Sequence, residues 1–248
     1  MSPQHRRISR LYLDRDLAAA RIALTEREAH YLGTVLRLER GARVLVFNGR
    51  GQERYASIRS LARRGAELEM LEASAPVPEP ELRLTLLQAL PKAEAMDLVV
   101  QKATELGVRA IVPVATDFSV VRLSGTRAER RIEHWSRIAQ SACEQSGRHR
   151  PTEIRPVVSL EACLDALPGS AAKLWLDTRS EAPFAPAAAP SAEVFLLVGP
   201  EGGFSAADAG LVEAHGFKAL RLGPRTLRTE TASIAACALL QHLWGDLR

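Results

Sequence analysis

The chain has 248 residues, of which 46% are hydrophobic, enough for one large domain or two smaller ones with real cores. No stretch approaches the ~20 apolar residues of a membrane helix, so we expect no membrane span. The three cysteines, Cys143, Cys163 and Cys237, are far apart, which argues against a disulfide framework and indicates a reducing cytoplasm. The six histidines are scattered as well, so we expect no metal site.

The net charge of +4 is unevenly distributed along the chain. Residues 1–75 contain 14 arginines, no lysine and 9 acidic residues, so this segment carries a net charge of +5 and the remainder is near −1. Arginine can fork onto a phosphate and stack on a base. Basic surfaces often contact only water, but this concentration in one segment favours a nucleic-acid ligand.

The first part of the chain, residues 6–73, is predicted to be a small β-rich unit with one helix, which we interpret as a small barrel. Thr25 and Glu28 form a capping box that begins a helix running to about Leu36. Asn48-Gly49, between two alternating stretches, predicts a tight hairpin. The expected strands are 10–13, 21–24, 43–47, 52–59 and 66–72.

A proline-rich stretch separates this unit from the rest. Pro76, Pro78 and Pro80 favour an extended chain and oppose both helix and central strand. We therefore expect a domain over 1–73, a linker over 74–81 and a second domain over 82–248.

The second domain alternates strands with helices, which is typical of a parallel sheet covered by helices. Ser205 and Asp208 form another capping box at a helix start. The last helix is apolar nearly all round, so it should be buried in the core or in a subunit interface. The expected strands are 82–90, 110–115, 154–158, 174–177, 194–198 and 217–222, and the expected helices are 94–106, 126–146, 160–167, 205–215 and 231–244.

The stretch 193–204, E-V-F-L-L-V-G-P-E-G-G-F, joins a buried strand to a helix through a glycine loop. Three glycines let the backbone approach a ligand closely, and open α/β sheets bind ligands at the carboxyl ends of strands. An ordinary strand–helix turn is the alternative, but such a turn rarely needs three glycines and a proline.

The spacing of this loop fits neither a dinucleotide fingerprint nor a phosphate loop. Glu201 would also repel bound phosphates, by about 1–4 kcal/mol at a separation of about 4 Å. Unless Glu201 simply faces solvent, the loop suits a weakly charged or cationic ligand.

A second strand is expected to end in Gly-Pro at Gly223-Pro224, and the two Gly-Pro breaks can form one pocket. Arg225, Arg228 and Glu230 lie in or near this turn, and Thr229 or Thr231 can cap the helix that follows. The alternative for Arg228 and Glu230 is a surface ion pair worth about 0–1 kcal/mol.

Two further stretches are weaker candidates. At the end of the long helix, Arg148 and Arg150 complement the helix dipole without any function, whereas Glu144 and the adjacent Gln145 would suit recognition of a base edge. Lys92 follows the first strand of the second domain, on the same side of the sheet as both Gly-Pro loops, although a lone lysine there is usually a solvated cap.

Taken together, these stretches resemble the RsmE family of SPOUT-class methyltransferases, which methylates N3 of a uridine in 16S ribosomal RNA. The resemblance covers essentially the whole chain, and its specificity comes from the order and spacing of several modest motifs. The matching motifs are Pro91-Lys92, Met96-Asp97, the stretch 101–107, Glu144-Gln-Ser-Gly-Arg148, Gly199-Pro-Glu-Gly-Gly-Phe204, the stretch 222–225 and Leu227-Arg-Thr-Glu-Thr-Ala232, with weaker matches at His30, 35–37 and 47–49.

The resemblance implies an α/β fold with an N-terminal PUA-like β-barrel that holds RNA and a C-terminal SPOUT α/β domain with a parallel sheet. It also implies a deep trefoil knot, which general connection rules disfavour and which no strand pattern could reveal. S-adenosylmethionine is the implied cofactor, and a homodimer acting on 16S ribosomal RNA, within the small ribosomal subunit, is the implied assembly.

The resemblance also assigns residues. Those implied in cofactor binding are Leu176, Asp177, Leu197, Val198, Gly199, Gly203, Leu222, Gly223 and Leu227. Those expected to contact RNA are Arg6, Arg7, Arg10, Arg37, Lys92 and Arg148. The chain departs from the family pattern after Lys92, where members often carry a further basic residue and this chain has Ala93, Glu94 and Ala95.

The implied chemistry requires alignment of donor and acceptor, which can contribute roughly 7–11 kcal/mol of the barrier. Because uridine N3 carries a proton at neutral pH, we expect Arg228 to stabilise the anionic base and either Glu230 or Glu144 to accept the proton. Two alternatives remain open from sequence: a non-catalytic RNA-binding or ribosome-assembly protein, and an enzyme that methylates the ribose 2′-hydroxyl.

Overall fold

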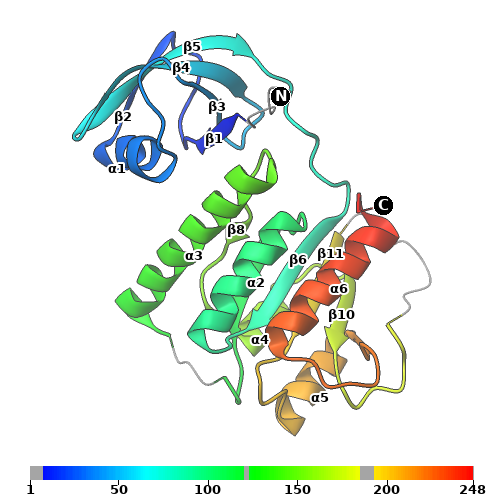
Figure 1. Ribbon diagram of the computed structural model, residues 1–248. Helices are drawn as coiled ribbons and strands as arrows, with labels where there is room; N and C mark the ends of the chain where they lie inside the picture. The colour runs from blue at the N-terminus through cyan, green and yellow to red at the C-terminus, as the bar shows by residue number, and fades with distance from the viewer. Residues whose placement is uncertain (1–7, 120–122, 185–192, 248) are drawn as a thin grey trace. The chain divides into compact units, whose positions relative to one another are not determined.

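The computed structural model describes residues 8–119, 123–184 and 193–247 (Figure 1). The chain divides into two compact units: unit 1 comprises Met1–Glu79 and Cys143–Arg150, and unit 2 comprises Pro80–Ala142 and Pro151–Arg248. The first break lies inside the predicted linker. Residues 143–150, which we expected in the second domain, belong to unit 1.

Unit 1 is built on a curved five-stranded sheet with the strand order β1-β3-β4-β5-β2 (Figure 1). β1 pairs with β3 in parallel, and the other pairs are antiparallel. The predicted hairpin is confirmed between β3 and β4, where Gly49 takes a φ of 70°. The strands are β1 (Ser9–Tyr12), β2 (Arg21–Leu24), β3 (Arg43–Phe47), β4 (Glu53–Ala62) and β5 (Gly65–Ala73).

The predicted helix of unit 1 is confirmed as far as Val35, but only its first part is α-helical. The capping box of Thr25 and Glu28 is confirmed at the start of α1 (Glu26–His30), but the chain then continues as a π-helical turn, η1 (Tyr31–Val35). Arg37 follows with a φ of 53°, the only positive φ at a non-glycine residue in the described ranges. This reversal lets both Leu36 and Leu38 pack on the core of unit 1, which a continuing α-helix would not do.

Unit 2 is built on a parallel sheet with the strand order β12-β10-β11-β6-β7-β8, in which β9 also pairs with β7. The sheet confirms the predicted parallel α/β architecture. The single expected strand over 154–158 is instead two short strands, because Pro156 between them has no N–H for the ladder. The strands are β6 (Arg83–Ala89), β7 (Ala110–Ala115), β8 (Glu153–Ile154), β9 (Val158–Ser159), β10 (Ala172–Leu176), β11 (Glu193–Val198) and β12 (Lys218–Leu220).

Helices cover both faces of this sheet (Figure 1). One face packs against α2 (Ala93–Glu105), α3 (Gly125–Ser146) and α6 (Thr229–Trp244), and the other packs against α4 (Leu160–Asp165) and α5 (Ala206–Ala214). The side chains of β11 alternate between the two layers, with Leu196 in the first and Leu197 in the second. The last turn of α3 belongs to unit 1.

The helix starts of unit 2 agree with the sequence at α5 and differ at α6. The capping box of Ser205 and Asp208 is confirmed at α5. At α6 the N-cap is Arg228, which makes no side-chain capping bond, and Thr229 is the first helical residue. Within the described ranges, no helix is both long and apolar enough to cross a membrane.

Candidate functional site

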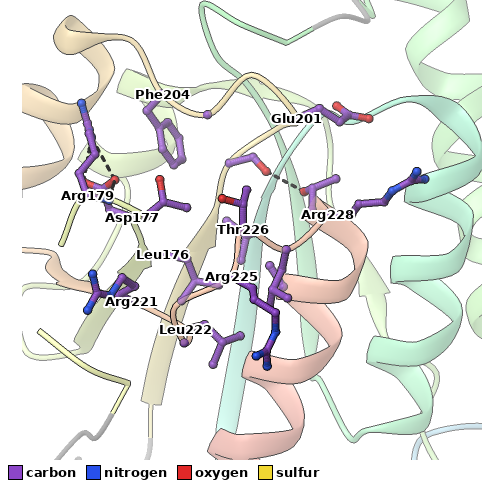
Figure 2. A pocket seen from close by; sticks show the side chains of 18 of the residues that line it. Leu176, Asp177, Arg179, Glu201, Phe204, Arg221, Leu222, Arg225, Thr226 and Arg228 are labelled. Atoms are coloured by element: carbon purple, nitrogen blue, oxygen red, sulfur yellow. Dashed lines mark hydrogen bonds and ion pairs between the residues drawn. The ribbon is translucent and has the colours of Figure 1, made fainter. Parts of the chain in front are cut away.

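A pocket of about 560 Å³ lies at the carboxyl ends of β10, β11 and β12 (Figure 2). Its walls are the segments 176–179, 198–204 and 220–229, together with Ala232. The volume is within the range of roughly 300–1,000 Å³ that small-molecule sites occupy. As the two Gly-Pro breaks predict, both loops line one pocket. They do not follow adjacent strands, because β10 lies between β11 and β12 and contributes Leu176 and Asp177.

The loop after β11 depends on its glycines for its shape. A Cβ atom on Gly199 would lie 3.0 Å from Cε2 of Phe204, so a side chain there would displace the aromatic ring. Gly203 takes a φ of 70° and its N–H donates to the carbonyl of Pro200 at 2.9 Å, which closes a tight turn. The phenyl ring of Phe204 packs in turn against the buried indole of Trp175, with the ring centroids 5.5 Å apart.

A buried polar network fixes this loop to the start of α6. The hydroxyl of Thr229 donates to the carbonyl of Gly199 at 2.7 Å and accepts from Nε2 of Gln88 at 3.1 Å. Gln88 is fully buried on β6, and its Oε1 accepts from the hydroxyl of Ser233. Because buried polar groups must find partners, this network sets the position of the loop relative to β6 and α6.

Two further loops, one after β7 and one before α2, also contact the glycine loop. A Cβ atom on Gly202 would lie 3.2 Å from Cβ of Phe118, which follows β7. The hydroxyl of Ser205 donates to the carboxylate of Asp117 at 2.7 Å. In the loop before α2, the backbone N–H of Lys92 donates to Oε1 of Glu201 at 3.1 Å.

The pocket carries charges of both signs (Figure 2). The carboxylate of Asp177 accepts from Nε of Arg179 at 3.1 Å, and this bond together with the negative charge raises the pKa of Arg179. Arg221, Arg225 and Arg228 line the same pocket and make no ion pair with any residue of the described ranges. The lining therefore suits a ligand that has apolar, anionic and cationic parts.

Most residues predicted to bind a cofactor lie in this pocket. Leu197 is the exception: its side chain is fully buried beneath the pocket, next to Trp175. The residues of the predicted cofactor and catalytic sets that line the pocket are Leu176, Asp177, Val198, Gly199, Gly203, Leu222, Gly223, Leu227 and Arg228.

Other predicted residues lie elsewhere. Glu230 is half-buried in the first turn of α6 and is not part of the lining. Lys92 is the exposed N-cap of α2. Arg37 is in unit 1, and Arg6 and Arg7 fall outside the described residues.

The stretch 144–148, which we considered for base recognition, is bonded inside unit 1. Oε1 of Glu144 accepts from the backbone N–H of Tyr12 at 2.9 Å, and its carboxylate also pairs with the hydroxyl of Tyr31. Burial raises the pKa of Glu144 despite these bonds. Arg148 forms an ion pair with Glu79. Glu144 therefore does not line the pocket.

Arg10 is similarly enclosed. Its guanidinium donates to Glu53 at 2.8 Å and to the carbonyl of Arg148 at 3.1 Å, and it lies 4.5 Å from the ring centroid of Phe47. The side chains of Arg10 and Arg148 are each only 10% exposed. The predicted RNA contacts of these two arginines would require their ion pairs to open.

The sequence did not predict several of the lining residues. Arg179 and Arg221 adjoin strand ends and could have been found only by knowing that β10 and β12 end at the same edge of the sheet. Thr229 was expected to cap a helix and instead bonds the glycine loop. Over the described residues, the structure contains no group of three or more potential metal ligands.

Comparison with known proteins identifies the family of the chain. A family model of an RNA methyltransferase domain matches residues 78–241, and a model of an RNA methyltransferase PUA domain matches residues 24–71. The chain is 31% identical to ribosomal RNA small subunit methyltransferase E of Buchnera aphidicola subsp. Schizaphis graminum, over 98% of this chain and 99% of the relative.

Solved structures agree with these matches. One is ribosomal RNA small subunit methyltransferase E from Neisseria gonorrhoeae bound to S-adenosylmethionine, with a TM-score of 0.90 and 34% identity over 97% of this chain and 100% of that chain. Another is a protein from Legionella pneumophila in complex with S-adenosylmethionine, with a TM-score of 0.93, 34% identity and the same coverage.

Proposed function

Because the chain belongs to the RNA methyltransferase family that includes ribosomal RNA small subunit methyltransferase E, we propose that it methylates N3 of a uridine in 16S ribosomal RNA. S-adenosylmethionine is the proposed methyl donor, and the enzyme acts in the cytoplasm, where ribosomal RNA is modified. The observation that carries this proposal is the pocket at the ends of β10, β11 and β12, built from two Gly-Pro loops.

The residues of the pocket fit the proposed donor. Leu176, Leu222 and Leu227 offer apolar surface for a purine, and the glycine loop exposes backbone to a closely bound ligand. Asp177 supplies a carboxylate for hydroxyl groups, and Arg221 and Arg225 suit the donor's carboxylate. When bound, S-adenosylmethionine supplies an already activated methyl group on a sulfonium.

The protein must then position the base and handle its proton. Arg228 lines the pocket at the start of α6, where its guanidinium can stabilise a negatively charged uracil ring. Of the two proposed proton acceptors, we prefer Glu230, which is adjacent to pocket-lining Thr229 on α6. The carboxylate of Glu144 is already engaged by Tyr12 and Tyr31.

The test is methyl transfer to small ribosomal subunits and to naked 16S ribosomal RNA that both lack the modification. Nuclease digestion and mass spectrometry of the product should find the methyl group on the uracil ring. A methyl group on the ribose would assign the protein to 2′-hydroxyl chemistry. Binding of RNA with neither methyl transfer nor heat on titration with S-adenosylmethionine would favour a non-catalytic role.

We also propose that the protein is a homodimer. The support is the outer surface of α2 and α6, where Leu98, Leu239 and Leu243 are each 38–44% exposed. Large apolar side chains left exposed on two helices that contact each other favour burial against another subunit. Light scattering coupled to size-exclusion chromatography should give a mass of about twice the 27.0 kDa of one chain, and a monomeric mass would contradict the proposal.

A further inference from the structure

Glu201 is the one charged side chain of the glycine loop, and it has a bonding partner on another element. The loop is attached to α6 through the carbonyl of Gly199 and to α2 through Glu201, whose Oε1 accepts from the N–H of Lys92 at 3.1 Å. The first attachment uses backbone of the loop, and the second depends on a side chain. Substitution of Glu201 therefore removes one attachment and leaves the other in place.

The partner of Glu201 is favourable for a carboxylate. Lys92 is the N-cap of α2, a helix of 13 residues, and it makes no side-chain capping bond. The N–H groups at a helix start have no partner within the helix and carry a partial positive charge, which attracts an anion. A charged acceptor at this position makes a stronger hydrogen bond than a neutral one.

Glu201 is also one of the residues that line the pocket, so two roles for it must be separated (Figure 2). In one, its charge acts directly on a cationic ligand. In the other, it acts through the loop, by holding the backbone of Gly199–Gly203 in the shape that receives the ligand. The observed bond to Lys92 favours the second role, because the oxygen that makes this bond is directed at α2.

We propose that Glu201 is a positioning residue that ties the cofactor loop to the N-terminus of α2. This inference rests on the proposed function, since it assumes that the pocket receives S-adenosylmethionine. The loop then keeps its binding geometry before the cofactor arrives, and loss of the tie imposes an ordering cost on every ligand of the loop, whatever its charge.

The first experiment compares two ligands that differ in charge. S-adenosylhomocysteine, the product of methyl transfer, has a neutral sulfur where S-adenosylmethionine has a cationic one. By calorimetry, Glu201→Ala should weaken the binding of both ligands by a similar factor, about 10- to 150-fold, which corresponds to the loss of one hydrogen bond to a charged group. Glu201→Gln keeps an acceptor oxygen and should recover most of the affinity for both ligands. If Glu201→Ala and Glu201→Gln both weakened the binding of S-adenosylmethionine equally and left that of S-adenosylhomocysteine unchanged, the proposal would be overturned.

A second pair of variants tests the donor of this bond. Lys92 has a φ of −56°, which proline can adopt, so Lys92→Pro deletes the N–H and keeps this dihedral angle. Lys92→Ala is the matched control, because it removes the side chain and keeps the N–H. We expect Lys92→Pro, but not Lys92→Ala, to weaken the cofactor as Glu201→Ala does, and the double variant Glu201→Ala/Lys92→Pro to be no weaker than either single one. Additive losses would contradict the proposal.

A third readout needs no cofactor. Hydrogen exchange of the Lys92 amide in the ligand-free protein should be faster in Glu201→Ala than in the wild type, and close to wild type in Glu201→Gln. Unchanged exchange in Glu201→Ala would refute the tie itself. If the wild-type protein bound neither ligand, the proposed function would fail, and the exchange measurement would still decide whether Glu201 holds the loop.

Discussion

The hydroxyl of Thr229 is the point at which the pocket can be weakened with the smallest change of shape. This hydroxyl donates to Gly199 at 2.7 Å and accepts from Gln88 at 3.1 Å, and the residue is only 5% exposed. Thr229→Val keeps the branched side chain and removes the oxygen. The carbonyl of Gly199 then loses this donor, whereas the amide of Gln88 retains the carbonyl of Ala89 at 3.0 Å.

The size of the effect follows from this asymmetry. An unsatisfied buried polar group costs about 1–3 kcal/mol, and one of the two partners keeps a second bond, so we expect the free energy of unfolding to fall by about 1–2 kcal/mol. For a chain of this size, each kcal/mol lowers Tm by about 2–4 °C. The affinity for S-adenosylmethionine should fall as well, because the carbonyl that moves belongs to the cofactor loop.

The assay is denaturant and thermal unfolding of wild type, Thr229→Val and the control Thr229→Ser, with calorimetry of cofactor binding on each. Serine keeps the hydroxyl and loses one methyl group, worth about 0.8 kcal/mol when buried. Thr229→Ser should therefore bind the cofactor nearly as wild type does. A Thr229→Val protein with the stability and the cofactor affinity of the wild type would refute the role of this network.

Three further predictions address other parts of the chain. Gly203→Ala should lower the free energy of unfolding by about 1–2 kcal/mol, because Gly203 has a φ of 70°. The control is Gly210→Ala, in the interior of α5, where no atom lies near the new Cβ; it should raise the free energy of unfolding by about 0.5–1 kcal/mol. Burial raises the pKa of Glu144 above its ordinary 4.5. The stabilising contribution of this group is therefore complete below pH 4.5 and is lost as the pH rises through the raised pKa. Urea unfolding across this range should show that the free energy of unfolding declines in the wild type and not in Glu144→Gln. Arg228→Ala should lower kcat by at least about tenfold with little change in the Kd of S-adenosylmethionine, and a change confined to Kd would contradict its proposed action on the base.

Local patterns predicted the elements well where the signal lies within a few residues. The bounds of β7 agree with the expected strand over 110–115, and both capping boxes and the Asn48-Gly49 hairpin are confirmed. Each of these depends on hydrogen bonds or backbone angles between residues close in sequence. The parallel sheet of unit 2 is also confirmed, because strand–helix alternation restricts the topology.

Features that depend on distant partners were not predictable in this way. The placement of β10 between β11 and β12 has no local signature, so Arg179 and Arg221 escaped notice as lining residues. Arginine has no preference for positive φ, so the change of chain direction at Arg37 could not be predicted from the sequence. Nothing in the sequence around Glu144 indicates that its partners are Tyr12 and Tyr31, more than a hundred residues away. The trefoil knot implied by the family resemblance stays a prediction.

The assembly of unit 1 from two separate segments has a consequence for how the chain can fold during synthesis. The N–H of Tyr12 on β1, the carboxylate of Glu79 and the N–H of Gly51 all find partners within 143–150. A ribosome that has made only the first 79 residues has produced every strand of the sheet but none of these partners. Until more than half of the chain has been translated, the N-terminal unit therefore lacks the partners of Glu79 and Gly51 and of the Tyr12 N–H on its edge strand β1. A fragment cut at the proline-rich linker would preserve that unfinished state indefinitely.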